Sequence, residues 1–416
     1  MFFDTRPSFN LSRFSKYQKI LFSTSLFLLF WSLADGILWY IVPIQIIKLG
    51  FSTSQMGLII ASSNVFGMLF DFVLARYLVN TNYRRLFLIV FGLSSIYPLV
   101  LWSSKGVPLL LVSMAFWGLY GDLQNFATFD FVNRRVKKAD HCQSYGIFDI
   151  FKGVGYLLAP IIAGIAITET LDFFPYSISI SFLLISAIFY LVLVDLSPKY
   201  DSPEFDHTKS YKKFNFIKEF HIVKSIIITL MPVLIFNTLY LLYNGAIWTI
   251  GPIFGESANY FRGFGGYLMA AYTLPTLIIS WYVGRITSNY GKKRTAYYSF
   301  LVSCLLLVPI SFINNPYLII FLVLLSSIGS SLSWPAIKGA YSDYISESHL
   351  YSKEIESLHD FTCNLGYIIG PVTAGVLADV FGIKNVFVIL SSFSACIIFY
   401  LIAVTPKHIT VRVSRR

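Results

Sequence analysis

Long apolar runs, each bounded by polar or charged residues, recur along the whole chain. A helix needs roughly 20 apolar residues to cross the ~30 Å hydrocarbon core of a bilayer, and these runs are of that length. They predict twelve transmembrane helices, at residues 20–48, 55–79, 86–104, 109–132, 147–168, 176–196, 225–253, 263–288, 295–313, 318–345, 359–381 and 386–404. The pattern therefore predicts an all-α membrane protein.

The second half of the chain repeats the first. Residues 35–85 align without a gap with residues 244–294, and ten of the 51 positions are identical. A second stretch repeats at an offset of 211 residues, where Asp149, Gly155, Tyr156, Pro160, Ala163 and Gly164 match Asp360, Gly366, Tyr367, Pro371, Ala374 and Gly375. Six spans, an even number, separate equivalent positions, which predicts two parallel six-helix repeats about an axis along the membrane normal.

The polar segment between the repeats predicts three parts. We expect an N-terminal six-helix half at residues 1–196, a cytoplasmic linker at residues 197–224, and a C-terminal six-helix half with a short basic tail at residues 225–416. A charged stretch near the end of the linker could form an amphipathic helix at the membrane surface or remain a solvated connection.

Composition predicts that the chain lies in a membrane, and the distribution of its charges predicts the orientation. Hydrophobic residues make up 56% of the chain and charged residues 13%, whereas soluble domains carry about 25% charge. Of the lysines and arginines outside the spans, 24 fall on the side of the termini and 4 on the other side. Because cations stay on the cytoplasmic side, we expect a multi-pass protein of the plasma or inner membrane with both termini cytoplasmic. The net charge of +11 reflects this topology rather than nucleic-acid binding.

Motifs for enzymatic chemistry are absent from the sequence. No Gly-x-x-x-x-Gly-Lys-Ser/Thr, His-x-Glu-x-x-His or Gly-x-Ser-x-Gly pattern occurs, and the four cysteines have no metal-binding spacing. We therefore expect no enzyme activity, no cofactor and no metal. The expected partners are a small-molecule substrate, protons and the lipid bilayer, with the protein itself monomeric.

Two loops resemble a family signature that reads roughly Gly-x-x-x-Asp-x-x-Gly-Arg-Lys. Residues 284–294 keep its glycines and cations, and residues 75–85 form a more divergent copy. Both copies lack the aspartate, at Val79 and Ser288. With the two six-helix halves and the cytoplasmic linker, these loops make the chain resemble the major facilitator superfamily over essentially its full length.

The fifth span resembles the Gly-x-x-x-Gly-Pro-x-x-Gly-Gly pattern of the drug and proton antiporters in that family. Residues 153–164 carry Gly155, Pro160 and Gly164, with alanine where two glycines are expected. Small residues at this spacing let helices approach closely. An equally good copy at residues 366–375 leaves open that both are packing seams inherited by duplication.

Carboxylates inside spans are the strongest candidates for chemistry. An ionisable residue at mid-membrane costs roughly 2.5 to 3.5 kcal/mol on insertion scales, so such residues tend to be functional or paired. Asp35 and Asp122 lie near the middle of the first and fourth spans, which by family resemblance line a central cavity, and Asp71 lies deeper in the second. We predict proton coupling at these three residues, with hydrogen-bonded structural carboxyls as the alternative.

Polar and aromatic residues of the same spans complete the expected cavity. The predicted lining consists of Trp39, Gln124, Asn237, Tyr240, Tyr243, Asn244, Trp248, Trp334 and Lys338. Lys338 lies near the end of its span and could instead extend its amine toward the cytoplasmic surface.

The family resemblance also implies a cytoplasmic gate, in which each cation-rich loop meets a helix end of the opposite half. Its predicted members are Arg76, Arg84, Arg85, Asp149, Arg285, Lys292, Lys293 and Asp360. In an outward-open state we expect Asp360 near the first-half cations and Asp149 near the second-half cations. Lys152, one turn from Asp149, is the competing partner.

These features predict a secondary transporter that works by alternating access. Our first hypothesis is efflux of a lipophilic or cationic compound in exchange for protons. Proton-coupled uptake of a nutrient such as a sugar fits the same fold, because fold does not fix function. A non-transporting membrane sensor or scaffold is a third alternative, but it would have no use for cavity carboxylates.

Overall fold

The computed structural model describes residues 16–77, 83–135, 141–167, 171–196, 216–257, 260–261, 263–279, 281–348, 351–406 and 409. Among these, the side chains of residues 16–18, 71–77, 133–134, 141–143, 216–222 and 353 are not described.

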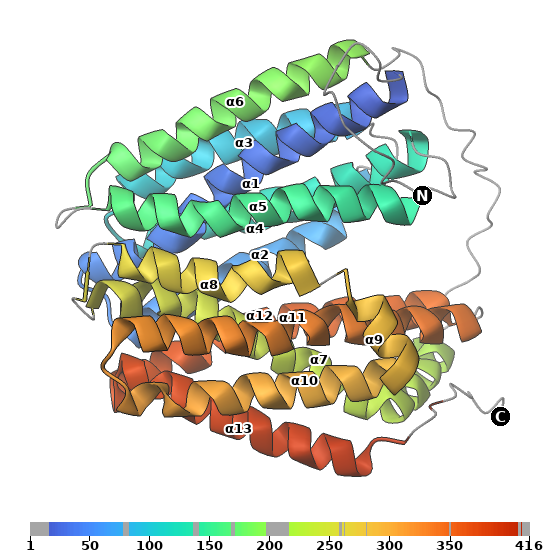
Figure 1. Ribbon diagram of the computed structural model, residues 1–416. Helices are drawn as coiled ribbons and strands as arrows, with labels where there is room; N and C mark the ends of the chain where they lie inside the picture. Colours follow the sequence, from blue (N-terminus) through green and yellow to red (C-terminus); the bar gives the residue numbers. More distant parts are fainter. Residues whose placement is uncertain are drawn as a thin grey trace, which may run out of the picture.

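The described part of the chain is helical throughout (Figure 1). Its elements are α1 (Lys16–Lys48), α2 (Thr53–Tyr77), α3 (Tyr83–Ser103), α4 (Val107–Arg135), α5 (His141–Ala166), α6 (Phe174–Leu196), α7 (Phe216–Ser257), α8 (Phe264–Ile279), α9 (Val283–Tyr290), α10 (Lys292–Leu307), the 3-10 helix η3 (Val308–Phe312), α11 (Pro316–Glu347), α12 (Ser352–Phe381) and α13 (Ile383–Val404). Nine helices of the described residues are long and apolar enough to cross a membrane. The all-α membrane fold is thus confirmed.

The remaining helices add detail to that simple picture. Helices α2 and α4 have 25 and 29 residues, enough to cross a bilayer, although neither is among the nine. The single span predicted at residues 263–288 is wrong, since α8 ends at Ile279 and α9 begins at Val283. Between them the N–H groups of Trp281 and Tyr282 bond to carbonyls three residues back, which tightens the helix into a turn. Twelve membrane passes follow only if α8 and α9 count as one, so that number stays a prediction.

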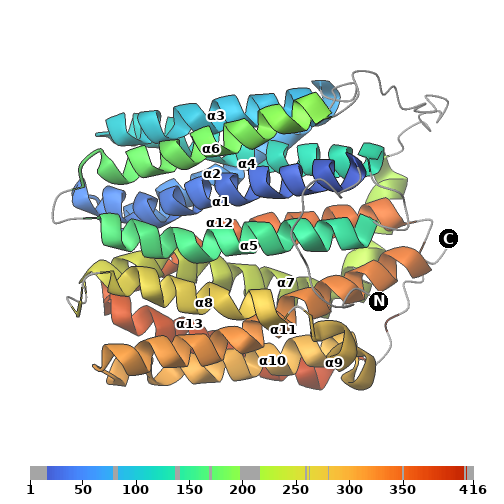
Figure 2. The ribbon, with the colours of Figure 1, turned by 45° about the horizontal axis from the view of Figure 1, so that its top comes forward.

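The helices gather into two groups that follow the halves of the sequence. Figure 1 shows α1–α6 on one side and α7–α13 on the other, and both Figure 1 and Figure 2 show all long helices running in nearly the same direction. Helix α7 begins at Phe216, inside the segment expected to be the linker, while residues 197–215 lie outside the described residues. Helix α1 begins and α13 ends at one end of the molecule, here called the terminal end; the opposite end is the distal end.

Repeated glycines bring the two groups into contact. Gly57 of α2 lies against the backbone of Pro371 on α12, and its repeat partner Gly266 of α8 lies against the backbone of Pro160 on α5. A Cβ at either glycine would overlap a proline carbonyl. Pro160 and Pro371 are themselves repeat partners, so one crossing occurs twice, as expected for parallel repeats.

Polar contacts also join the groups at the distal end. The backbone N–H groups of Thr53 and Ser54 at the start of α2 donate to the Asp379 carboxylate of α12, at 3.0 and 2.8 Å. The Tyr40 hydroxyl of α1 donates to Glu256 of α7 at 3.3 Å. In this conformation the two groups are therefore held together toward the distal end.

Candidate functional site

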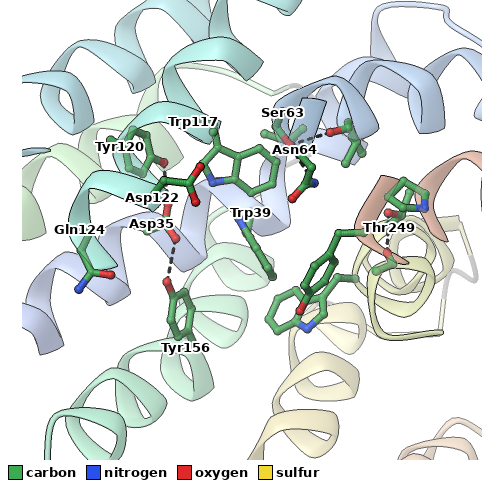
Figure 3. A pocket seen from close by; sticks show the side chains of 18 of the residues that line it. Asp35, Trp39, Ser63, Asn64, Trp117, Tyr120, Asp122, Gln124, Tyr156 and Thr249 are labelled. Carbon is green, nitrogen blue, oxygen red and sulfur yellow. Dashed lines mark hydrogen bonds between the residues drawn. The ribbon is translucent and has the colours of Figure 1, made fainter. Parts of the chain in front are cut away.

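A cavity of about 290 Å³ lies between the two groups (Figure 3). Its lining residues Asp35, Asp122 and Tyr156 lie near mid-length of α1, α4 and α5. Residues of α1, α2, α4 and α5 line it on one side, and residues of α7 and α12 on the other. Its volume is at the lower end of the range for small-molecule sites. The cavity is the candidate substrate site.

Asp35 is the buried acid of this cavity. Only 6% of its surface is exposed, and its two carboxylate oxygens accept hydrogen bonds from the hydroxyls of Tyr120 at 2.6 Å and Tyr156 at 2.9 Å (Figure 3). A phenol hydroxyl can donate or accept. The same two tyrosines can therefore hold Asp35 in either protonation state, because a protonated carboxyl can donate to one phenol oxygen. This arrangement suits a group that gains and loses a proton.

Tryptophans form the cavity wall where the two groups meet. Trp39 of α1 contacts Trp117 of α4 and Trp248 of α7, with ring centroids 5.3 and 4.9 Å apart and edge-to-face geometry. Trp39 and Trp248 are repeat partners, so they meet across the repeat axis. Trp39 Nε1 is buried and has no acceptor among the described residues, so it is an unsatisfied donor beside the cavity.

The remaining polar lining comes mainly from α4 and α5. Asp122 lies beside Gly67 of α2, where the missing side chain leaves room for its carboxyl group. The Lys152 ammonium donates to Gln124 Oε1 at 3.2 Å. Five predicted residues thus come together around the cavity: Asp35, Trp39, Asp122, Gln124 and Trp248.

Other predicted residues lie outside the cavity lining. The amide of Asn237 donates to Thr362 Oγ1 at 2.7 Å and so joins α7 to α12. The Tyr243 hydroxyl faces Ser391 of α13 at 3.4 Å. Asn244 stands behind the cavity, where its amide donates to the Tyr272 hydroxyl at 3.2 Å. The side chain of Asp71 is outside the described residues.

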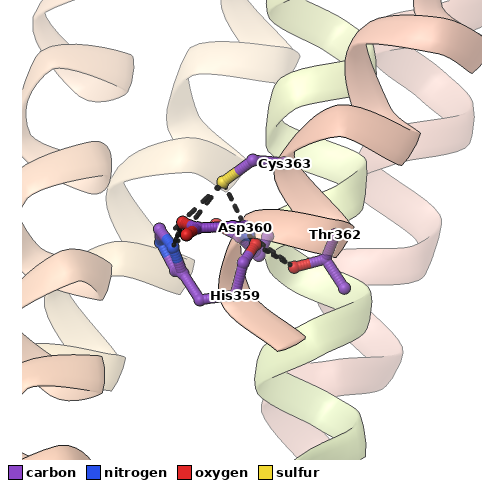
Figure 4. A network of polar contacts seen from close by, with 5 residues as sticks. His359, Asp360, Thr362 and Cys363 are labelled. Carbon is purple, nitrogen blue, oxygen red and sulfur yellow. Dashed lines mark hydrogen bonds and ion pairs between the residues drawn. The ribbon is translucent and has the colours of Figure 1, made fainter. Parts of the chain in front are cut away.

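Three more predicted residues, Tyr240, Trp334 and Lys338, form a separate cluster in the C-terminal half. Tyr240 stacks on Trp334 with centroids 5.2 Å apart, and the Lys338 ammonium lies over the Trp334 ring at 5.0 Å. His359 stacks near Trp334 and contacts Asp360 at 3.2 Å (Figure 4). These residues do not line the cavity of Asp35.

Three of the predicted gate residues have contacts within their own half. Lys292 forms an ion pair with Asp343, and Lys293 donates to the Pro406 carbonyl at 2.6 Å. The Arg84 guanidinium lies 6.0 Å from the Tyr83 ring. The exposed members are Arg85, Asp149, Arg285 and Asp360. The side chain of Arg76 is outside the described residues, and cross-half pairing stays a prediction.

Sequence reasoning missed the partners of Asp35. Tyr156 sits in the second repeated stretch, and its repeat partner Tyr367 also lines the cavity. Its identity in both halves was a usable signal, although a repeated tyrosine is as easily a packing residue. Lys152 was visible as a cation inside a span but was considered only as a partner of Asp149. Nothing in the sequence indicates that Tyr120 reaches Asp35.

Two helical groups that enclose a cavity with a buried acid are typical of polytopic membrane transporters. The model of the Major Facilitator Superfamily matches residues 20–261 and 233–415. The chain belongs to this family, and it is a multi-pass membrane protein of a transporter family.

Individual known proteins are also similar to this chain. The "Uncharacterized MFS-type transporter YfiS" of Bacillus subtilis (strain 168) is 26% identical over 137 residues, so the match spans about a third of each chain (32%). Among solved structures, the nucleoside transporter NupG has a TM-score of 0.69 at 13% identity, covering 94% of this chain and 99% of its own.

Two further structures have the same fold. A bacterial homolog of the human lysosomal transporter Spinster, inward-facing and unoccupied, has a TM-score of 0.69 at 11% identity, with 93% and 95% of the two chains covered. The human organic anion transporter MFSD10 has a TM-score of 0.62 at 14% identity, with 92% and 99% covered. At these identities the likeness shows the fold alone.

Proposed function

We propose that this protein is a monomeric secondary transporter of the cell membrane, which exports a small lipophilic or cationic compound in exchange for protons by alternating access. The observation that carries the proposal is Asp35, a buried acid held by two tyrosines on the wall of a cavity between the two helical groups. An acid at this depth is costly unless it has a function or a partner.

The hydrogen bonds of Asp35 link its proton to the surrounding helices. Asp35 is on α1, Tyr120 on α4 and Tyr156 on α5, so a proton on Asp35 changes the bonds among three helices of one half. Two of these helices carry interface residues, namely Trp39 on α1 and Pro160 on α5. Protonation can therefore bias how the two halves meet, which is what coupling requires.

The side on which the cavity opens follows from the orientation we propose. With both termini cytoplasmic, the contacts at the distal end close the extracellular side. Asp149 and Asp360 are exposed at the terminal end, which becomes the open cytoplasmic side. We therefore assign this conformation as inward-facing, in line with the similarity to the inward-facing structure of the Spinster homolog.

Two observations support export of a lipophilic or cationic compound. The glycine and proline pattern of the fifth span, now on α5, resembles that of drug and proton antiporters, and its Pro160 packs against the other half. The tryptophan wall and the carboxyl group of Asp122 suit an apolar cation, which binds to ring faces and to negative charge. The amides of Asn64, Gln124 and Asn364 favour a second candidate, proton-coupled uptake of a polar nutrient.

Flux measurements with purified protein in liposomes distinguish the two candidates. A panel of cationic drugs, sugars and amino acids is tested under an imposed pH gradient, with a fluorescent reporter of internal pH. Export by antiport predicts that a cationic compound moves against the proton flow. Movement of a sugar or amino acid together with protons would instead establish uptake, and uptake without any proton flux would refute the coupling.

A further inference from the structure

Lys152 of α5 lines the cavity but has no role in the proposed proton coupling. Its ammonium donates to Gln124 Oε1, and the orientation of Gln124 is fixed from the other side. Thr128 Oγ1 donates its only proton to the Gln124 backbone carbonyl at 2.9 Å, so it can only accept from Gln124 Nε2, at 3.0 Å. The glutamine oxygen must then face Lys152, which gives the lysine a fixed position on the cavity wall.

The hydrogen-bond capacity of Lys152 exceeds what its surroundings use. An ammonium has three N–H donors, and Gln124 is the one acceptor that the described residues provide. Neither Asp35 nor Asp149 accepts a hydrogen bond from Lys152 among the described residues, although both carboxylates attract its charge. A cation inside a membrane span that keeps free donors commonly marks a substrate path.

A second lysine, the exposed Lys338, lies at a similar distance from the terminal end in the other half. Lys152 is eleven residues after His141, and Lys338 is nine residues before Glu347. At 1.5 Å per residue, they lie about 17 and 14 Å from the terminal ends of their helices. Lys338 repels the Lys152 ammonium, more weakly than Asp149 and Asp35 attract it. Bringing the halves together at this end would increase the repulsion unless an anion lies between them.

We propose that Lys152 binds an anionic oxygen group, a carboxylate or a phosphate, on an aromatic substrate, and that Lys338 adds positive potential from the other half. The ring of the substrate lies against Trp39 and Trp248. This inference rests on the proposed function, because it places the substrate in the same cavity. It narrows the substrate to compounds that carry an anionic group in addition to any amine.

Binding of three size-matched probes tests the assignment. Tryptophan fluorescence of the full-length protein in nanodiscs is titrated with 3-phenylpropionate, phenyl phosphate and phenethylamine, with Trp39, Trp117 and Trp248 as reporters beside the cavity. Lys152→Gln should weaken at least one acidic probe about tenfold or more, the size expected for a hydrogen bond to a charged group, and leave the amine unchanged or tighter. Lys152→Arg should keep the preference for that acid.

The controls separate this proposal from its alternatives. Lys384→Gln makes the same change at the distal end, where the lysine bonds to a loop carbonyl, and should affect none of the probes. Binding of neither acid at millimolar concentration, equal weakening of all three probes by Lys152→Gln, or no weakening of either acid would overturn the proposal. Failure of the proposed function would give a different result. The preference for the acidic probe would persist in the binding assay, while Asp35→Asn would leave proton flux unchanged. The acid that depends on Lys152 shows whether the group is a carboxylate or a phosphate.

Discussion

The start of α2 provides a specific way to weaken closure at the distal end. The first N–H groups of a helix have no partner within it. Two of these groups are paired between Ser52 and Gln55. Ser52 N donates to Gln55 Oε1 at 3.0 Å, and Gln55 N donates to Ser52 Oγ at 3.2 Å. The next two, on Thr53 and Ser54, donate to Asp379 of the opposite half. Asp379 therefore caps α2 only while the halves are together.

The magnitude of this cap follows from known helix termini. A side chain that caps a helix N-terminus contributes about 1 kcal/mol, and a negative charge there about 0.3 to 1 kcal/mol. Asp379 is exposed, so water screens the charge and we keep to about 1 kcal/mol for Asp379→Ala. That energy is present only in the closed state. The substitution should therefore shift the equilibrium toward opening at the distal end about fivefold.

Distances between spin labels at the distal end measure this shift. Labels at Lys105, between α3 and α4, and at Tyr317, at the start of α11, are exposed and lie in opposite halves. The population at long distance should rise about fivefold in Asp379→Ala. Asp172→Ala is the matched control, since this exposed aspartate accepts from Phe174 within its own half. An unchanged distribution in Asp379→Ala, or an equal shift in both variants, would refute the reasoning.

Three further predictions follow from the interface and the topology. Gly266→Ala should slow transport about tenfold, because the added Cβ overlaps the backbone at Pro160. Gly92→Ala, which has open space around it, should leave the rate unchanged. Equal transport rates in the two variants would contradict the close crossing. With Cys142 as the only cysteine, an impermeant thiol reagent should label inverted vesicles but not intact cells, and labelling from outside would overturn the orientation. Cysteines at positions 149 and 285 should crosslink in the outward-open state and arrest transport; crosslinking without arrest would remove the gating role.

The repeat explains why the fold could be predicted from the sequence. Gly57 and Gly266 are identical across the halves, and each packs against a proline that is also repeated. Both the two groups of helices and their crossings thus follow from one internal comparison. The break between α8 and α9 could not be predicted, because the apolar pattern continues through Trp281 and Tyr282 although the backbone turns there.

The candidate site was only partly predictable. Asp35 and Trp39 are visible because a charge and a repeated tryptophan stand out inside an apolar span, and both line the cavity. Which side of each helix faces the cavity could not be predicted from the sequence pattern. Tyr243 lies two residues from Gly245, which lines the cavity, yet its hydroxyl faces Ser391 of α13. Tyr120 and Tyr156 reach Asp35 from two other helices, a contact that depends on tertiary packing alone.

The coupling role of Asp35 is the central claim, and proton flux in proteoliposomes tests it most directly. Asp35→Asn keeps the size of the side chain and a hydrogen-bonding oxygen for Tyr120 or Tyr156, but it cannot carry a proton across the cycle. We expect the variant to fold and to bind substrate, and to lose substrate-driven proton movement and gradient-driven transport. Full proton-coupled transport by Asp35→Asn would contradict the account and make this carboxylate a structural group.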